Sequence, residues 1–109
     1  MEFVETETFT KRIVRLGLED ELRELQNEIL QNPEKGRLDP GTGGLRKIRM
    51  ADPGRGKGKS GGARCHYLYL SHRKRVYLIF VYGKDEDDTL TPDQKKQLLA
   101  VVQRIKQEK

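Results

Sequence analysis

The chain has 109 residues and a formal net charge of +5, from 22 Lys and Arg against 17 Asp and Glu. A chain of this length buries roughly two-thirds of its unfolded surface, which supports one modest core, so we expect a single domain over residues 1–109. No apolar run approaches the roughly 20 residues that cross a bilayer, and the N-terminus lacks a signal-peptide pattern. We therefore expect a cytoplasmic protein without membrane contact.

Residues that bind metals or form covalent bridges are scarce. Cys65 is the single cysteine, and His66 and His72 are the two histidines. One cysteine excludes an internal disulfide, and these three side chains do not provide a ligand set with metal-binding spacing. Disulfide scaffolds and zinc fingers are set aside, and we expect no metal and no cofactor.

Positive charge is concentrated in the middle of the chain. Residues 1–39 hold 6 basic and 10 acidic side chains, whereas residues 46–64 hold seven basic side chains against Asp52 alone. Such local charge favours a site that faces a polyanion, although a solvated basic loop is the competing interpretation. The seven are Arg46, Lys47, Arg49, Arg55, Lys57, Lys59 and Arg64.

Two amphipathic helices are predicted in the first third of the chain. Between residues 9 and 29, apolar side chains recur at the three- and four-residue spacings of helices. Thr8 is the predicted N-cap of the first helix, and Gly17 separates the two. Asn32 and Pro33 end the second helix, because a residue before proline disfavours the helical region.

Strands are predicted from short apolar and β-branched runs bounded by turn residues. The turn-rich segment 36–44 reads as a connector, and the glycine-rich segment 51–62 reads as a mobile loop. Because the last two runs are almost continuously apolar, we expect both faces of their sheet to be covered. The predicted strands are a short one at 3–4, then 45–50, 63–71 and 76–83, the last two joined by a turn at 72–75.

A last helix is predicted to begin at Thr91, with Pro92 in its first turn. Its apolar face is formed by Leu98, Val102 and Ile105. The resulting fold class is α+β: a small, mostly antiparallel sheet on which two N-terminal helices and one C-terminal helix pack.

Two nucleotide-binding patterns occur in the glycine-rich segment and fail on context. Residues 56–61 match G-x-G-x-x-G, but a strand is expected to follow them where the dinucleotide fold has a helix. A P-loop interpretation fails as well, because Pro53 stands where its first glycine is needed. What remains is a glycine loop whose cations can approach the phosphates of a nucleic acid.

The remaining chemically reactive residues receive structural interpretations. His66 and His72 are predicted about 20 Å apart along extended chain, so we favour a structural role for each over an acid–base pair. Cys65 lacks an evident partner base and is expected to be packed. Tyr82, at the end of its strand, either reaches the rim of the sheet or points into the core.

Two stretches taken together carry a family resemblance: PGTGGLRKIRMADPGRGKGKSGGARCHYLYL at 40–70 and VYLIFVYGKDEDDTLTPDQKKQL at 76–98. In combination they resemble the RelE/HigB group of toxins from type II toxin–antitoxin systems, within the RelE/ParE superfamily. The resemblance covers essentially the whole chain. It implies a microbial-ribonuclease-like α+β domain of RelE type, acting as an mRNA interferase.

The implied activity is ribosome-dependent and metal-independent: an endoribonuclease cleaves translated mRNA in the ribosomal A site and thereby inhibits translation. The implied partners are mRNA, the ribosomal RNA of the A site, and a cognate antitoxin of the helix-turn-helix, HigA-like kind that silences the toxin.

The resemblance also implies site residues. Lys57 and Lys59 match the family's loop lysines and are candidates for the base or for electrostatic support. Arg64 matches the arginine that grips the scissile phosphate, and Lys84 stands where relatives place a stabiliser or acid. Some relatives carry a functional tyrosine in the last helix; residues 91–109 have none, so Tyr82 is the candidate substitute.

Further cations are predicted to dock ribosomal RNA through phosphate contacts. They are Arg46, Arg49, Arg55, Arg73, Lys74 and Arg75. For Arg73, Lys74 and Arg75 the alternative is that they are simply exposed residues of the hairpin turn. Two other functions remain open: a ParE-like toxin that inhibits DNA gyrase, and a non-catalytic RNA-binding module.

Overall fold

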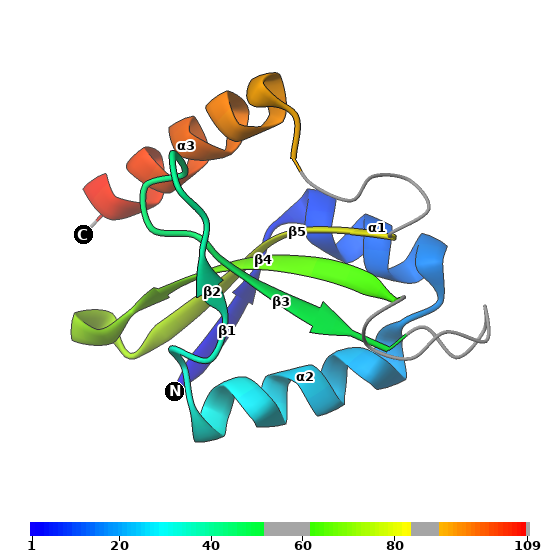
Figure 1. The fold of residues 1–109 in the computed structure, drawn as a ribbon. Coiled ribbons are helices and arrows are strands. Elements are labelled where there is room, and N and C mark those ends of the chain that lie inside the picture. The colour runs from blue at the N-terminus through cyan, green and yellow to red at the C-terminus, as the bar shows by residue number, and fades with distance from the viewer. Residues whose placement is uncertain (52–61, 84–89, 109) are drawn as a thin grey trace.

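The computed structural model describes residues 1–51, 62–83 and 90–108 (Figure 1). It is an α+β fold with a five-stranded mixed sheet and three α-helices, which confirms the predicted class. The elements, in chain order, are β1 Glu2–Glu5, α1 Glu7–Leu16, α2 Glu19–Gln31, β2 Arg37–Leu38, β3 Arg46–Met50, β4 Ala63–Leu70, a short 3₁₀ turn Ser71–Arg73, β5 Arg75–Gly83 and α3 Pro92–Gln107.

The strand order across the sheet is β1-β5-β4-β3-β2. β4 and β5 form a long antiparallel hairpin at the centre, and β3 and β2 extend it antiparallel on one side. On the other side β1 runs parallel to β5. The sheet is therefore antiparallel at three of its four strand pairings, as predicted.

Helices cover both faces of the sheet, which confirms the expectation drawn from the apolar strands. α1 and α2 pack on one face around a core that includes Phe9, Leu25 and Tyr67. α3 packs on the other face over a second core that includes Leu68 and Val102. Figure 1 shows α3 above the sheet and α2 below it.

An irregularity in β5 reverses which face its last residues point to. Tyr67 pairs with Leu78 but His66 pairs with Phe80, so Ile79 is an extra residue on β5. A bulge of this kind shifts the side-chain alternation beyond it. As a result Val81 joins the core under α1 and α2, whereas Tyr82 joins the core under α3.

The N-cap of α1 differs from the prediction. Thr6, rather than Thr8, caps the helix: its hydroxyl accepts a hydrogen bond from the Phe9 amide at 3.1 Å and donates one to the Ile79 carbonyl at 2.8 Å. The backbone amide of Thr6 also bonds the Leu78 carbonyl. These long-range contacts with β5, absent from any local pattern, set the start of the helix two residues earlier.

The other predicted helix boundaries agree with the structure. Gly17 ends α1 in the left-handed conformation, with φ +68°, and α2 stops before the Asn32 cap. α3 begins with Thr91 as N-cap in a complete capping box with Gln94. Among the described residues, no helix is both long enough and apolar enough to cross a membrane.

The connector between β2 and β3 is held tightly against α3. The Thr42 hydroxyl donates to the Asp39 carbonyl at 2.6 Å, and Nζ of Lys106 donates to the Gly43 carbonyl at 2.7 Å. Gly43 has φ +74°, and a Cβ at this position would lie 2.8 Å from Leu99. Figure 1 shows the connector rising from the sheet to α3. It thereby carries Asp39 toward the α3 face.

Candidate functional site

Arg64 and Tyr82 lie side by side on one face of the sheet. They are register partners on β4 and β5, and Arg49 of β3 is the partner of Arg64 on its other side. Directly paired residues point to the same face, here the α3 face. Arg64 is 3% exposed and Tyr82 2% exposed, whereas Arg49 is exposed. The sequence-predicted Arg64 and Tyr82 are thus neighbours at one end of the sheet.

The burial of Arg64 gives this end of the sheet a fixed positive charge. One guanidinium nitrogen donates to the Gly62 carbonyl at 3.3 Å. A guanidinium does not lose its proton in a protein, so Arg64 stays cationic inside the fold. A charge held by its surroundings in a weakly polar environment interacts strongly with an anion that reaches it.

Tyr82 belongs to a cluster of rings on the α3 face. The His66 ring stacks on the Tyr82 ring, with centroids 5.6 Å apart and planes 23° apart, and Nε2 lies 3.4 Å from the Tyr82 hydroxyl. Phe80 tilts against Tyr82 at 5.8 Å, and the Arg12 guanidinium lies 4.8 Å from the Phe80 ring centroid. The tyrosine is therefore oriented by packing on two sides.

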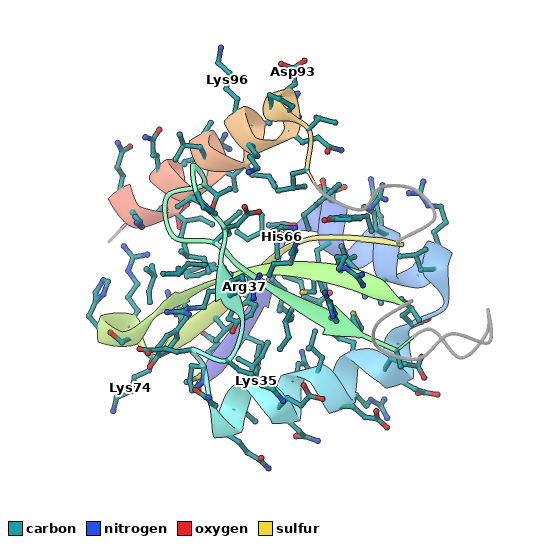
Figure 2. All side chains as sticks on the ribbon, viewed as in Figure 1. Lys35, Arg37, His66, Lys74, Asp93 and Lys96 are labelled. Carbon is teal, nitrogen blue, oxygen red and sulfur yellow. The ribbon has the colours of Figure 1, made fainter. Side chains whose placement is uncertain are left out.

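His66 is fully buried and faces a carboxylate. Figure 2 shows it in the interior between the sheet and α3. Its Nδ1 lies 3.7 Å from Oδ2 of Asp39, and Nζ of Lys95 lies 3.3 Å from the other oxygen of that carboxylate. Burial lowers the pKa of His66 to about 4, against the opposing effect of Asp39 and with Lys47 and Lys95 lowering it further. His66 is therefore neutral near pH 7.

Sequence reasoning missed Asp39 and Lys95, and it treated His66 only as a structural residue apart from the site. Asp39 lies 27 residues before His66 and Lys95 lies in the last helix, so no short motif joins them. The one available signal was a histidine in a strand that is apolar apart from Arg64, because a polar group that becomes buried needs partners.

A cavity of about 200 Å³ adjoins the ring cluster. It lies between the start of α1 and α3, and Phe80 forms part of its wall. Phe80 thereby links the cavity to Tyr82. The lining residues are Thr6, Thr8, Ile79, Phe80, Gln97, Leu98 and Val101.

Arg73, Lys74 and Arg75, predicted to dock RNA, lie at the opposite end of the sheet from Arg64. The β4–β5 hairpin turns at Ser71–Arg73, whereas Arg64 is near the start of β4, a separation of roughly 20 Å along extended strand. Arg73 donates to the Ile105, Lys106 and Glu108 carbonyls at the end of α3.

Lys74 and Arg75, which follow Arg73, have different surroundings. Arg75 pairs with Glu2 at 2.6 Å and remains partly exposed. Lys74 is exposed and projects outward in Figure 2. The structure therefore does not bring this basic turn together with Arg64 and Tyr82.

The two arginines of β3, both predicted to dock RNA, have different surroundings. Arg46 donates to the Glu34 and Gly36 carbonyls, at 3.0 and 2.8 Å, and so braces the connection after α2. Arg49 borders a small cleft along the acidic side of α2, lined also by Glu21, Glu24 and Glu28. Arg49 is therefore the exposed arginine of β3 that pairs in register with Arg64, and it also borders the cleft along α2.

Four predicted site residues lie outside the described residues: Arg55, Lys57, Lys59 and Lys84. The motif at 56–61 and the acidic run at 85–88 lie outside them as well. Both undescribed internal segments continue from the same end of the sheet, because Met50, Ala63 and Gly83 are register partners across β3, β4 and β5.

Cys65 is packed in the core and His72 lies in the hairpin turn, the positions predicted for them. Cys65 is fully buried beneath α1 and α2, and burial raises the pKa of its thiol. His72 is exposed in the hairpin turn, far along β4 from His66. Within residues 1–51, 62–83 and 90–108, no three His, Cys, Asp or Glu side chains gather as a metal-binding group.

Comparison of the sequence with models of known protein families finds no match. The case for a function therefore depends on the residues of the site.

Proposed function

We propose that this protein is the toxin of a type II toxin–antitoxin system and acts as a metal-independent, ribosome-dependent mRNA endonuclease. The observation that supports it most is the register pairing of Arg64 with Tyr82 on the α3 face. This pairing joins a permanent cation to a group with an exchangeable proton, at the end of the sheet from which the lysine-bearing segments continue.

Such a pair suits transesterification of RNA. The ribose 2′-oxygen loses its proton and attacks the adjacent phosphorus, and the bond from phosphorus to the 5′-oxygen breaks as that oxygen gains a proton. Arg64 binds the phosphate oxygens and stabilises the charge that develops on them. Tyr82 takes part in proton transfer, and Lys57, Lys59 and Lys84 supply the remaining positive charge and proton-transfer groups.

The proposed substrate is messenger RNA in the ribosomal A site, and the proposed regulator is a helix-turn-helix antitoxin. The cations outside the catalytic set dock the ribosomal RNA by phosphate contacts, which weaken as salt rises. Phe80, half-buried and part of the wall of the cavity between α1 and α3, is the aromatic side chain proposed to contact an unpaired base. The proposed setting is the cytoplasm, where translation takes place.

The test is cleavage of a translated message in a bacterial translation extract. Wild-type protein is expected to cut the message, and Arg64→Ala to lose on the order of a hundredfold of the rate. Arg64→Lys keeps a charge without the planar fork and should lose activity while remaining folded. Arg23→Ala, on the exposed surface of α2, is the matched control and should cleave normally.

An intact message with wild-type protein would refute the proposal. A gyrase supercoiling assay on the same preparation would then test the ParE-like alternative. If Arg64→Ala changed only RNA affinity, the non-catalytic RNA-binding module would be the better description.

A further inference from the structure

The imidazole of His66 has one nitrogen engaged and one without a hydrogen-bond partner. Its ring is completely buried, and Nε2 faces the Tyr82 hydroxyl at 3.4 Å. Among the described residues, Nδ1 has no hydrogen-bond partner. An unsatisfied buried polar atom in a native fold calls for an explanation, because it costs free energy.

The Asp39 carboxylate lies 3.7 Å from Nδ1, and the fold holds that carboxylate in place. The Asp39 amide donates to the Leu45 carbonyl at 2.9 Å, and the Asp39 carbonyl accepts from Thr42 at 2.6 Å. Oδ1 faces Lys95 at 3.3 Å, which leaves Oδ2 directed at Nδ1 of His66 at 3.7 Å. Both the backbone and the side chain of Asp39 are thus fixed.

A carboxylate facing Nδ1 selects one form of the neutral ring. In a neutral imidazole one nitrogen carries the proton and the other accepts. The carboxylate accepts only, so the form with hydrogen on Nδ1 is favoured and Nε2 becomes the acceptor. Within the part of the chain that the structure describes, the charged groups that act on the ring are Asp39 from the connector, Lys47 from β3 and Lys95 from α3. Arg64 lies two residues before His66 on β4.

We propose that Asp39 and His66 are positioning residues for Tyr82. Asp39 selects the Nδ1–H form of His66, so that Nε2 accepts a hydrogen bond from the Tyr82 hydroxyl and fixes the orientation of that hydroxyl. This inference rests on the proposed function, in which Tyr82 meets the RNA. The phenolic oxygen, with its hydrogen directed at His66, meets RNA as an acceptor, which matches a donating ribose 2′-hydroxyl.

The first test needs no RNA. Nitrogen-15 NMR of the histidine-labelled full chain at pH 7 is expected to show His66 neutral with hydrogen on Nδ1. Asp39→Asn can present its amide NH₂ to Nδ1, which then accepts, so the variant should shift His66 toward the Nε2–H form. Asp93→Asn makes the same change at an exposed position on α3, away from His66 in Figure 2, and should leave the form unchanged.

An Nε2–H ring in the wild type, or an unchanged ring in Asp39→Asn, would overturn the inference. Because this measurement involves no cleavage, the ring form of His66 is determined whether or not the protein cleaves RNA. Conversely, an active enzyme with the wrong ring form would remove the positioning role and leave the ribonuclease proposal intact.

The second test measures coupling in the cleavage assay. Asp39→Asn is expected to lower kcat by about 10- to 100-fold with little change in KM, as other orienting partners of an active group do. In a Tyr82→Phe background the same change should cost nothing further, because the hydroxyl that it positions is gone. Independent, multiplicative losses would contradict positioning through Tyr82.

Two substitutions of His66 separate positioning from packing. The Gln side chain has a polar end that can face the Tyr82 hydroxyl, whereas Leu fills space without such a group. His66→Gln is therefore expected to retain more kcat than His66→Leu, with circular dichroism confirming that both are folded. Equal losses in two folded variants would show that the ring only packs.

Discussion

Tyr82 shares a face with Arg64 because β5 contains one residue more than β4 requires. The extra residue, Ile79, shifts the alternation of β5, and its carbonyl is held by the Thr6 hydroxyl at 2.8 Å. Without that shift, Tyr82 would face α1 and α2. The Thr6 hydroxyl that caps α1 therefore also bonds the extra residue that turns Tyr82 toward the face of Arg64.

The pH dependence of stability should report the burial of His66. Its pKa is lowered to about 4 in the fold from 6.5, so between these values the unfolded chain binds more protons than the folded one. Stability from this residue is fully present above about pH 6.5 and is lost as pH falls toward 4, by about 2–3 kcal/mol. Urea unfolding at pH 7 and pH 4.5 measures it.

Carboxylates also titrate in this range, so the His66→Gln variant is the reference for that experiment. Its stability should fall less than that of the wild type between the two pH values. Equal falls would mean that His66 takes up its proton as readily in the folded state as in the unfolded chain.

Gly43→Ala should destabilise the fold by about 2–4 kcal/mol. Its φ of +74° disfavours any side chain, and the new Cβ would lie 2.8 Å from Leu99 and 3.2 Å from Val102, so strain and overpacking both act. Gly41→Ala is the matched control: φ is +81° but no atom lies within 4 Å of its Cβ. Chemical unfolding should show a smaller loss in the free energy of unfolding, about 1–2 kcal/mol, for Gly41→Ala. Equal losses for the two variants would contradict tight packing of Gly43 against α3.

Arg73→Ala should loosen the end of α3. The guanidinium donates to three carbonyls there, those of Ile105, Lys106 and Glu108. The last carbonyls of a helix lack the full set of intrahelical partners, and here that of Ile105 also accepts from the Glu108 amide. We expect faster amide hydrogen exchange in the last turn and a loss of about 1–2 kcal/mol. Lys74→Ala, at the adjacent exposed position, should change neither, and comparable fraying there would indicate that charge rather than capping matters.

Tyr67→Phe should cost about 1–3 kcal/mol in the free energy of unfolding. The buried hydroxyl accepts from the Gly36 amide at 2.9 Å and donates to the Pro33 carbonyl at 2.8 Å, so its removal leaves two backbone groups unsatisfied. Tyr69→Phe, half-buried on the same strand, serves as the comparison in urea unfolding. A loss no greater than that of Tyr69→Phe would show that Tyr67 contributes through its ring alone.

The local pattern of residues determined the elements and most of their ends. Apolar spacing at Leu98, Val102 and Ile105 predicted the buried face of α3, and Thr91 with Pro92 predicted its start, because capping and periodicity depend on neighbours within a turn or two. The same reasoning predicted the central hairpin and predicted that both faces of its sheet are covered. Arg64 and Tyr82 were identified as site candidates from motifs near the strand ends.

Only the tertiary structure decided which side chains meet. The extra residue at Ile79, the Asp39 carboxylate beside His66 and the contact of Arg73 with the end of α3 all join segments far apart in the chain. Such pairings depend on strand register and on packing between layers, neither of which leaves a local signature in the sequence. A one-residue shift in register turns every later side chain of the strand to the other face. For that reason the sequence indicated an arginine and a tyrosine, whereas the fold added the aspartate and histidine beside them.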